Sequence, residues 1–119
     1  MKELMIYFSE DSDLVEAESL MKEWRGDILV SYDGLLYQLD FVTINRINRE
    51  FDLAKRDSRI YCLNNTVVVE CVNRDNIIRA ITKLVEANMI SECSTIDLEQ
   101  FYSNTFPQLS SIKNWKRVY

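Results

Sequence analysis

The stretch DILVSYDGLLYQLDFV, which runs from Asp27 to Val42, places Asp33-Gly34 between two runs of mostly apolar residues. An Asp-Gly pair in this setting is typical of a two-residue hairpin turn, because both turn residues adopt a positive φ. Counting outward from the turn predicts the cross-strand pairs Tyr32–Leu35, Val30–Tyr37, Ile28–Leu39 and Asp27–Asp40. One face of this hairpin is wholly apolar and the other is mixed, so we expect an antiparallel sheet with one face covered.

A strand and an amphipathic helix are predicted before this hairpin. The apolar run Leu4–Phe8 is typical of a short buried strand, and Asp13, with Glu16 three residues later, can begin a helix as its N-cap. Arg25-Gly26 supplies a basic last turn and a C-terminal stop. The predicted helix carries one apolar stripe along its length, which consists of Leu14, Ala17, Leu20, Met21 and Trp24. We expect this stripe to pack on the sheet while the acids of the helix face water.

The stretch RIYCLNNTVVVEC, from Arg59 to Cys71, predicts a second hairpin that turns at Asn64-Asn65. In this register Glu70 faces Arg59, which we interpret as a structural ion pair. Cys62 and Cys71 share a face but lie about 13 Å apart along it, which is too far for a disulfide. We therefore expect the cysteines to be unlinked thiols that serve packing.

The most regular helical pattern follows Asn73, a candidate N-cap, and stops at Asn88. Its apolar residues are Ile77, Ile78, Ile81, Leu84 and Val85. Residues 45–57 fit either a short helix, which we favour, or an extended strand and loop. Residues 89–93 are compatible with an edge strand, and Ser94 can start a last short helix that Pro107 ends. We expect Trp115 to pin the C-terminal tail.

These elements predict an α+β fold with a single, mostly antiparallel sheet of four to six strands packed with two or three helices. The chain has 119 residues, with two glycines and one proline, and no linker-like segment is visible. We therefore expect residues 1–119 to form one globular domain.

The composition argues against most common enzyme chemistries. The chain has no histidine and three cysteines without a C-x-x-C pair, so the commonest general base and the commonest zinc-site patterns are missing. No phosphate-binding loop, nucleophile elbow or calcium loop is present. We predict no catalytic, cofactor-binding or metal-binding residue. The N-terminal apolar run is short and no run reaches membrane-spanning length, so we expect a cytoplasmic protein without a membrane partner.

The chain is acidic, with 19 Asp and Glu against 14 Lys and Arg, which gives a net charge of -5. This balance repels nucleic acid, and the few basic residues of the C-terminal tail do not offset it. It suits a basic protein partner instead. Acids of the first hairpin and of the first helix, with two tyrosines as aromatic anchors, are the predicted partner-binding residues: Glu10, Asp11, Asp13, Asp27, Tyr32, Asp33, Tyr37 and Asp40. Tyrosines on an apolar strand face more often belong to the core, so the carboxylates carry more weight in this prediction.

The succession GLLYQLDFVTINRI, followed by YCLNNTVVVECVNRDNIIRAITKLVEANMI, resembles the small immunity proteins of bacterial polymorphic and contact-dependent growth inhibition toxin systems. In many of these a hydrophobic strand ending in glutamate runs through an Asn-rich cap into an I..AI..LVE helix. The resemblance covers about half of the chain and transfers no functional residue. It implies a dedicated protein that binds and neutralises a cognate toxin, commonly a nuclease, without catalysis.

Two alternatives remain open from the sequence. Asp27 opposite Asp40 would place two carboxylates face to face, an arrangement that needs a cation, a proton or a basic group to relieve repulsion. With Glu70 these carboxylates could serve a small metal-assisted enzyme. The other alternative is a regulatory adaptor protein.

Overall fold

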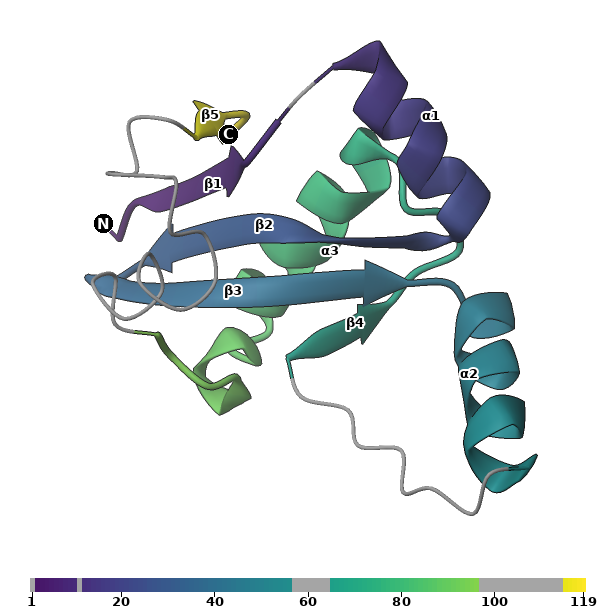
Figure 1. Cartoon of the computed structure of the whole chain (residues 1–119). Coiled ribbons are helices and arrows are strands. Elements are labelled where there is room, and N and C mark those ends of the chain that lie inside the picture. Colours follow the sequence, from purple (N-terminus) through teal and green to yellow (C-terminus); the bar gives the residue numbers. More distant parts are fainter. Residues whose placement is uncertain (1, 11, 57–64, 97–114) are drawn as a thin grey trace.

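The computed structural model describes residues 2–10, 12–56, 65–96 and 115–119. Within them, five strands form one sheet in the order β4-β3-β2-β1-β5 (Figure 1). The antiparallel strands are β1 (Leu4–Phe8), β2 (Trp24–Tyr32), β3 (Leu35–Val42) and β5 (Lys116–Arg117), while β4 (Thr66–Val68) runs parallel to β3. The helices are α1 (Asp13–Lys22), α2 (Ile44–Arg56), α3 (Arg74–Glu86) and the short 3₁₀ helix η1 (Ile90–Glu92). The predicted α+β class with a single, mostly antiparallel sheet is confirmed.

The first hairpin turns at Asp33-Gly34 as predicted, with φ values of 53° and 77° at these residues. The predicted pairs Tyr32–Leu35, Val30–Tyr37 and Ile28–Leu39 are all present. Beyond Ile28 the register shifts, and Arg25 pairs with Phe41. Gly26 and Asp27 together therefore lie opposite Asp40, in a β-bulge. The predicted one-to-one pairing of Asp27 with Asp40 is wrong, because the extra residue of the bulge interrupts the alternation there.

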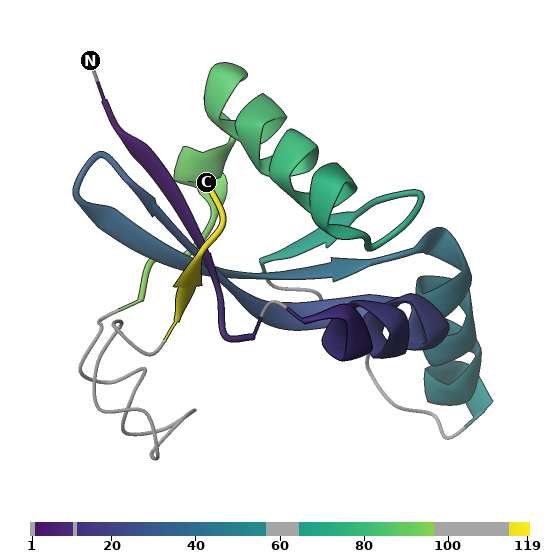
Figure 2. The same cartoon turned by 90° about the horizontal axis from the view of Figure 1, so that it is seen from above.

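One face of the sheet is covered by α3 (Figure 2). The helix begins as predicted at Asn73, whose side-chain oxygen accepts a hydrogen bond of 2.8 Å from the backbone N of Asn76, and Asn88 follows it at a φ of 56°. Its fully buried Ile77 and Ile81 join the core residues that the strands supply. These strand residues are Ile6, Phe8, Ile28, Val30, Tyr37, Leu39 and Phe41. The second face carries a smaller cluster in which Trp115 packs on Leu29, as expected for a pinned tail.

The second predicted hairpin lies only partly in the described residues. Asn65 has a φ of 52°, in keeping with a turn residue, but its expected partner strand, including Arg59 and Cys62, lies outside them. The last predicted helix, from Ser94 onward, likewise falls mainly in residues 97–114, outside the description.

Residues 89–93 do not form the edge strand that the sequence suggested. They contain η1 instead, because the chain leaves α3 through a hydrogen bond from the backbone N of Met89 to Leu84 O, 2.8 Å long, and Ile90 is then buried against the core.

Cys71 and Cys93 are free thiols, as predicted. Both are partly buried, and burial, with Glu92 nearby, raises the pKa of the Cys93 thiol. A raised pKa lowers the thiolate fraction, which suits a packing role.

The favoured helix at residues 45–57 is confirmed as α2, which projects from the end of β3 (Figure 1). Ile44 and Phe51 on this helix are exposed. In the described residues, no helix combines the length and apolar character needed to cross a membrane.

Candidate functional site

Helix α1 begins and ends at positions that differ from the prediction. Its N-cap is Ser12, whose hydroxyl accepts a hydrogen bond from the backbone N of Val15, so Asp13 is the first helical residue. It ends at Lys22 and is followed by Glu23 in the left-handed conformation. Trp24, which the sequence pattern assigned to the apolar stripe of the helix, is the first residue of β2.

The apolar stripe of α1 faces water, contrary to the prediction. Leu14 is 68% exposed and Met21 is 83% exposed. We call the stripe formed by Leu14, Ala17, Leu20 and Met21 the outer face of α1; all four residues are exposed. The one helix residue that is buried is Ser19. The helix therefore turns Val15, Glu16 and Ser19 inward and leaves these four apolar residues in solvent.

The physical reason for this orientation is the buried side chain of Arg25. The β-bulge brings Arg25 into register with Phe41 on the core side of the sheet, where it is 1% exposed. Its guanidinium lies 4.2 Å from the centre of the Phe8 ring. Taking a cation out of water is costly unless oxygen atoms surround it. An apolar helix side placed over this group would leave the charge unsatisfied.

The segment before α1 and the first half of the helix supply such oxygens. Arg25 Nη2 donates a 2.8 Å hydrogen bond to the backbone oxygen of Glu10, and Arg25 Nη1 lies 3.5 Å from Glu16 Oε2. The other carboxylate oxygen of Glu16 accepts a hydrogen bond of 2.9 Å from the backbone N of Arg74, the first residue of α3. Glu16 thus joins the polar side of α1 to a buried cation and to a helix N-terminus, where a negative charge is favourable.

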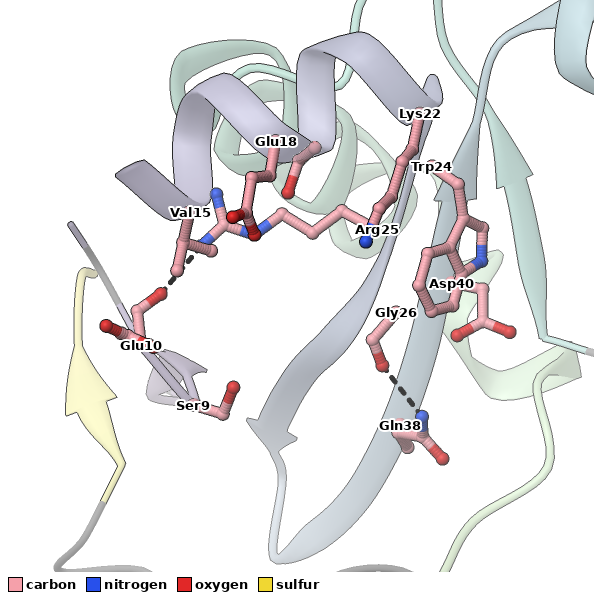
Figure 3. A pocket seen from close by; sticks show the side chains of 11 residues that line it. Ser9, Glu10, Val15, Glu18, Lys22, Trp24, Arg25, Gly26, Gln38 and Asp40 are labelled. Atoms are coloured by element: carbon pink, nitrogen blue, oxygen red, sulfur yellow. Dashed lines mark hydrogen bonds between the residues drawn. The ribbon is translucent and has the colours of Figure 1, made fainter. Parts of the chain in front are cut away.

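Beside this polar contact lies a cavity of about 470 Å³. It is bounded by α1, by the start of β2 and by the second half of β3. Figure 3 shows Trp24 and Asp40 close together on one side of it and Glu10 and Ser9 on the other. Its lining consists of Ser9, Glu10, Val15, Glu18, Ser19, Lys22, Trp24, Arg25, Gly26, Gln38 and Asp40. Burial raises the pKa of the Asp40 carboxyl above its ordinary value, so the ionised form is incompletely solvated.

The predicted partner-binding residues divide between two places. Glu10 and Asp40 line the cavity, and Asp13 is exposed at the start of α1. Asp33 lies at the far tip of the hairpin, where it forms an ion pair of 3.4 Å with Lys2. The structure therefore does not bring all the predicted acids into one surface.

The two predicted tyrosine anchors differ in burial. Tyr37 is 2% exposed and belongs to the core, so it is not available as a surface anchor. Tyr32 is partly buried against the same core. Asp11 lies outside the described residues, and Asp27 belongs to β2, with its side chain also outside the description.

Sequence reasoning missed the outer face of α1 and the role of Trp24. The position of Trp24 follows from the early end of the helix, and the signal that could have found that end is Gly26. A glycine inside an apolar segment suggests a strand bulge as readily as a helix stop. The outer face of α1 follows from the burial of Arg25, which no local pattern in the sequence indicates.

No three His, Cys, Asp or Glu side chains gather as a metal site would require within the described ranges. Comparison with known protein families, with curated proteins and with solved structures found no match to this chain. Its function must therefore be inferred from its own residues.

Proposed function

We propose that this chain is a non-catalytic protein-binding module, an immunity protein that binds and neutralises a cognate bacterial toxin with a basic surface, such as a nuclease. The observation that carries the proposal is the exposed outer face of α1. A helix that holds its leucines and a methionine in solvent while it buries a serine gains no hydrophobic stabilisation from those apolar side chains in the isolated protein. Contiguous exposed apolar residues with a polar rim are typical of protein-binding sites.

The rim of this surface indicates the charge of the partner. Glu10, Asp13 and Glu18 are exposed at or beside α1, in a chain whose net charge is -5. Acidic groups around an apolar centre attract a basic protein, speed its encounter and repel nucleic acid. A toxin that cleaves nucleic acid needs a basic surface for its substrate, so it is the kind of partner that such a rim selects.

The adaptability of the most exposed residue of this face also suits a binding role. Met21 is the most exposed large apolar side chain among the described residues. Methionine is unbranched and polarisable, so it fits irregular apolar surfaces with little strain. We expect the apolar residues to control dissociation and the acidic rim to control the association rate.

The test is co-expression with the toxin candidate of the adjacent reading frame in the native bacterium. We expect that candidate to kill cells that lack this chain, to bind the chain with one-to-one stoichiometry, and to lose at least tenfold in affinity when the chain carries Met21→Glu. Met89→Glu is the matched control, because Met89 is likewise an exposed methionine, at 50%, but lies after α3. Neighbouring candidates that neither bind nor kill would overturn the proposal, and so would equal losses in the two variants.

A further inference from the structure

The cavity beside α1 contains a carboxylate whose bonding is incomplete. The backbone N of Asp40 donates to Asn65 O at 3.0 Å. In residues 2–10, 12–56, 65–96 and 115–119, its side chain makes neither a hydrogen bond nor an ion pair, although it is partly buried. A partly desolvated carboxylate without a protein partner is a cost to the folded protein. Such a group is favourable only when a cation or a hydrogen-bond donor enters the cavity.

An aromatic ring stands next to this carboxylate. Trp24 and Asp40 meet above Gly26: a Cβ atom at that position would lie 2.5 Å from Asp40 Oδ1 and would also overlap the indole ring. Trp24 is 40% exposed, so part of its ring is open to an incoming group. The absence of a side chain at Gly26 is therefore what allows the indole and the carboxylate to share one wall of the cavity (Figure 3).

The same wall offers a neutral acceptor. Gln38 Nε2 donates a hydrogen bond of 2.8 Å to the backbone oxygen of Gly26. This bond fixes the amide and leaves Gln38 Oε1 as a further acceptor in the lining of the same cavity. The wall thus combines a carboxylate, an amide oxygen and an aromatic ring.

The basic residues of the lining do not neutralise this wall. Arg25 already has Glu16, Glu10 O and the Phe8 ring as partners. Lys22 is exposed, and its flexible, strongly hydrated side chain can move aside. The wall therefore favours a positive and planar group.

We infer that this cavity binds the guanidinium group of an arginine side chain from the basic partner, stacked on Trp24 and paired with Asp40. The inference rests on the proposed function and names the contact that would anchor the partner. Arginine fits better than lysine because its planar, weakly hydrated guanidinium can stack on an indole while it donates two parallel hydrogen bonds. An arginine in a partly desolvated aromatic pocket is a common energetic centre of a protein interface.

The pocket can be tested without the toxin, by NMR on the indole N–H signals of Trp24 and Trp115. The probe is N-acetyl-arginine amide, and we expect saturable shifts of the Trp24 signal with a Kd on the order of 1 mM. N-acetyl-citrulline amide has nearly the same shape without charge, and N-acetyl-lysine amide has the charge without the plane. We expect both to bind at least fivefold more weakly. The Trp115 signal serves as an internal control.

Variants connect the binding to the proposed wall. Asp40→Asn should lower the affinity for the arginine probe at least tenfold. Asp52→Asn removes an exposed charge on α2 and should leave that affinity unchanged. Equal binding of the three probes, absence of a saturable shift, or full affinity in Asp40→Asn would each overturn the inference.

The same variants separate this inference from the proposed function. If a toxin binds and is neutralised equally well by the wild type and by Asp40→Asn, the protein-binding function stands and the arginine pocket does not. If no toxin binds but the arginine probe retains its specificity, the pocket stands and the immunity function does not.

Discussion

Helices α3 and α1 both carry apolar residues at helical spacing, yet they use their apolar sides in opposite ways. α3 buries Ile77 and Ile81 completely, whereas α1 exposes Leu14 and Met21 and buries Ser19. Beneath α3 lies the apolar face of the sheet, so burial of its apolar side releases water from both surfaces. Beside α1 lies a buried guanidinium that needs oxygen atoms. Helical periodicity therefore identifies the apolar side of a helix, but the surface next to it decides which side turns inward.

The largest expected effect on the free energy of unfolding comes from removing an apolar side chain from each helix in turn. Ile81→Ala should lower the free energy of unfolding by about 2–5 kcal/mol, because it leaves a cavity in the core. Met21→Ala should change it by no more than about 0.5 kcal/mol, as an exposed substitution does. Urea denaturation followed by circular dichroism measures both. A cost of more than about 1.5 kcal/mol for Met21→Ala would mean that the outer face is buried after all.

A smaller effect tests why α1 turns its polar side inward. Glu16→Gln removes the negative charge beside the buried Arg25 and should lower the free energy of unfolding by about 2 kcal/mol, since hydrogen bonds to buried charged groups are strong. Glu23→Gln breaks a shorter ion pair, 2.7 Å from Arg49, but Arg49 is exposed. We expect a cost below about 0.5 kcal/mol there. Similar losses in the two variants would show that the burial of Arg25 is not what orients α1.

The smallest expected effect is a gain in the free energy of unfolding when Asp40 is replaced by Asn. Because burial raises its pKa in the folded state, the folded protein binds this proton more tightly than the unfolded chain does. The contribution of Asp40 to stability therefore grows as the pH falls from above the folded pKa to the ordinary value of 3.8. Asp40→Asn should be slightly more stable than the wild type at neutral pH, and the difference should disappear at about pH 4 or below.

Denaturation at several pH values measures the Asp40 difference directly. Asp52→Asn, on the exposed side of α2, should show no such gain at neutral pH. A stability loss at neutral pH in Asp40→Asn would indicate that the carboxylate has a favourable partner in the free protein, and the cavity would then not be poised for an incoming cation.

The elements that could be predicted are those governed by local chemistry. Asp33-Gly34 fixes a turn by the φ values that it tolerates, and the register of the hairpin follows by counting. Asn73 and Asn88 mark α3 in the same local way. These signals need no knowledge of the rest of the molecule.

The features that escaped prediction depend on contacts between distant segments. The bulge at Gly26-Asp27 shifts the register of β2 and places Arg25 on the core side of the sheet. The order of apolar and polar residues in β2 does not reveal this shift. Its partners Glu10 and Glu16 come from the preceding segment, and no spacing rule connects them to it. The parallel pairing of β4 with β3 likewise joins residues far apart in the chain. The candidate cavity depends on both the bulge and α1, so only its acids were visible in the sequence.

The corner where α1 meets β2 has a consequence for how this chain can vary. A single residue, Glu23, separates the two elements, and a single residue, Thr43, separates β3 from α2. The backbone N of Thr43 donates to Glu23 O at 3.1 Å, which ties the two junctions together. An inserted residue would have to be absorbed by turning α1 about 100° on its axis, which would carry its leucines away from their present direction. Side chains on the outer face of α1 can therefore change with little loss of folding stability, while the length of the corner is held almost fixed.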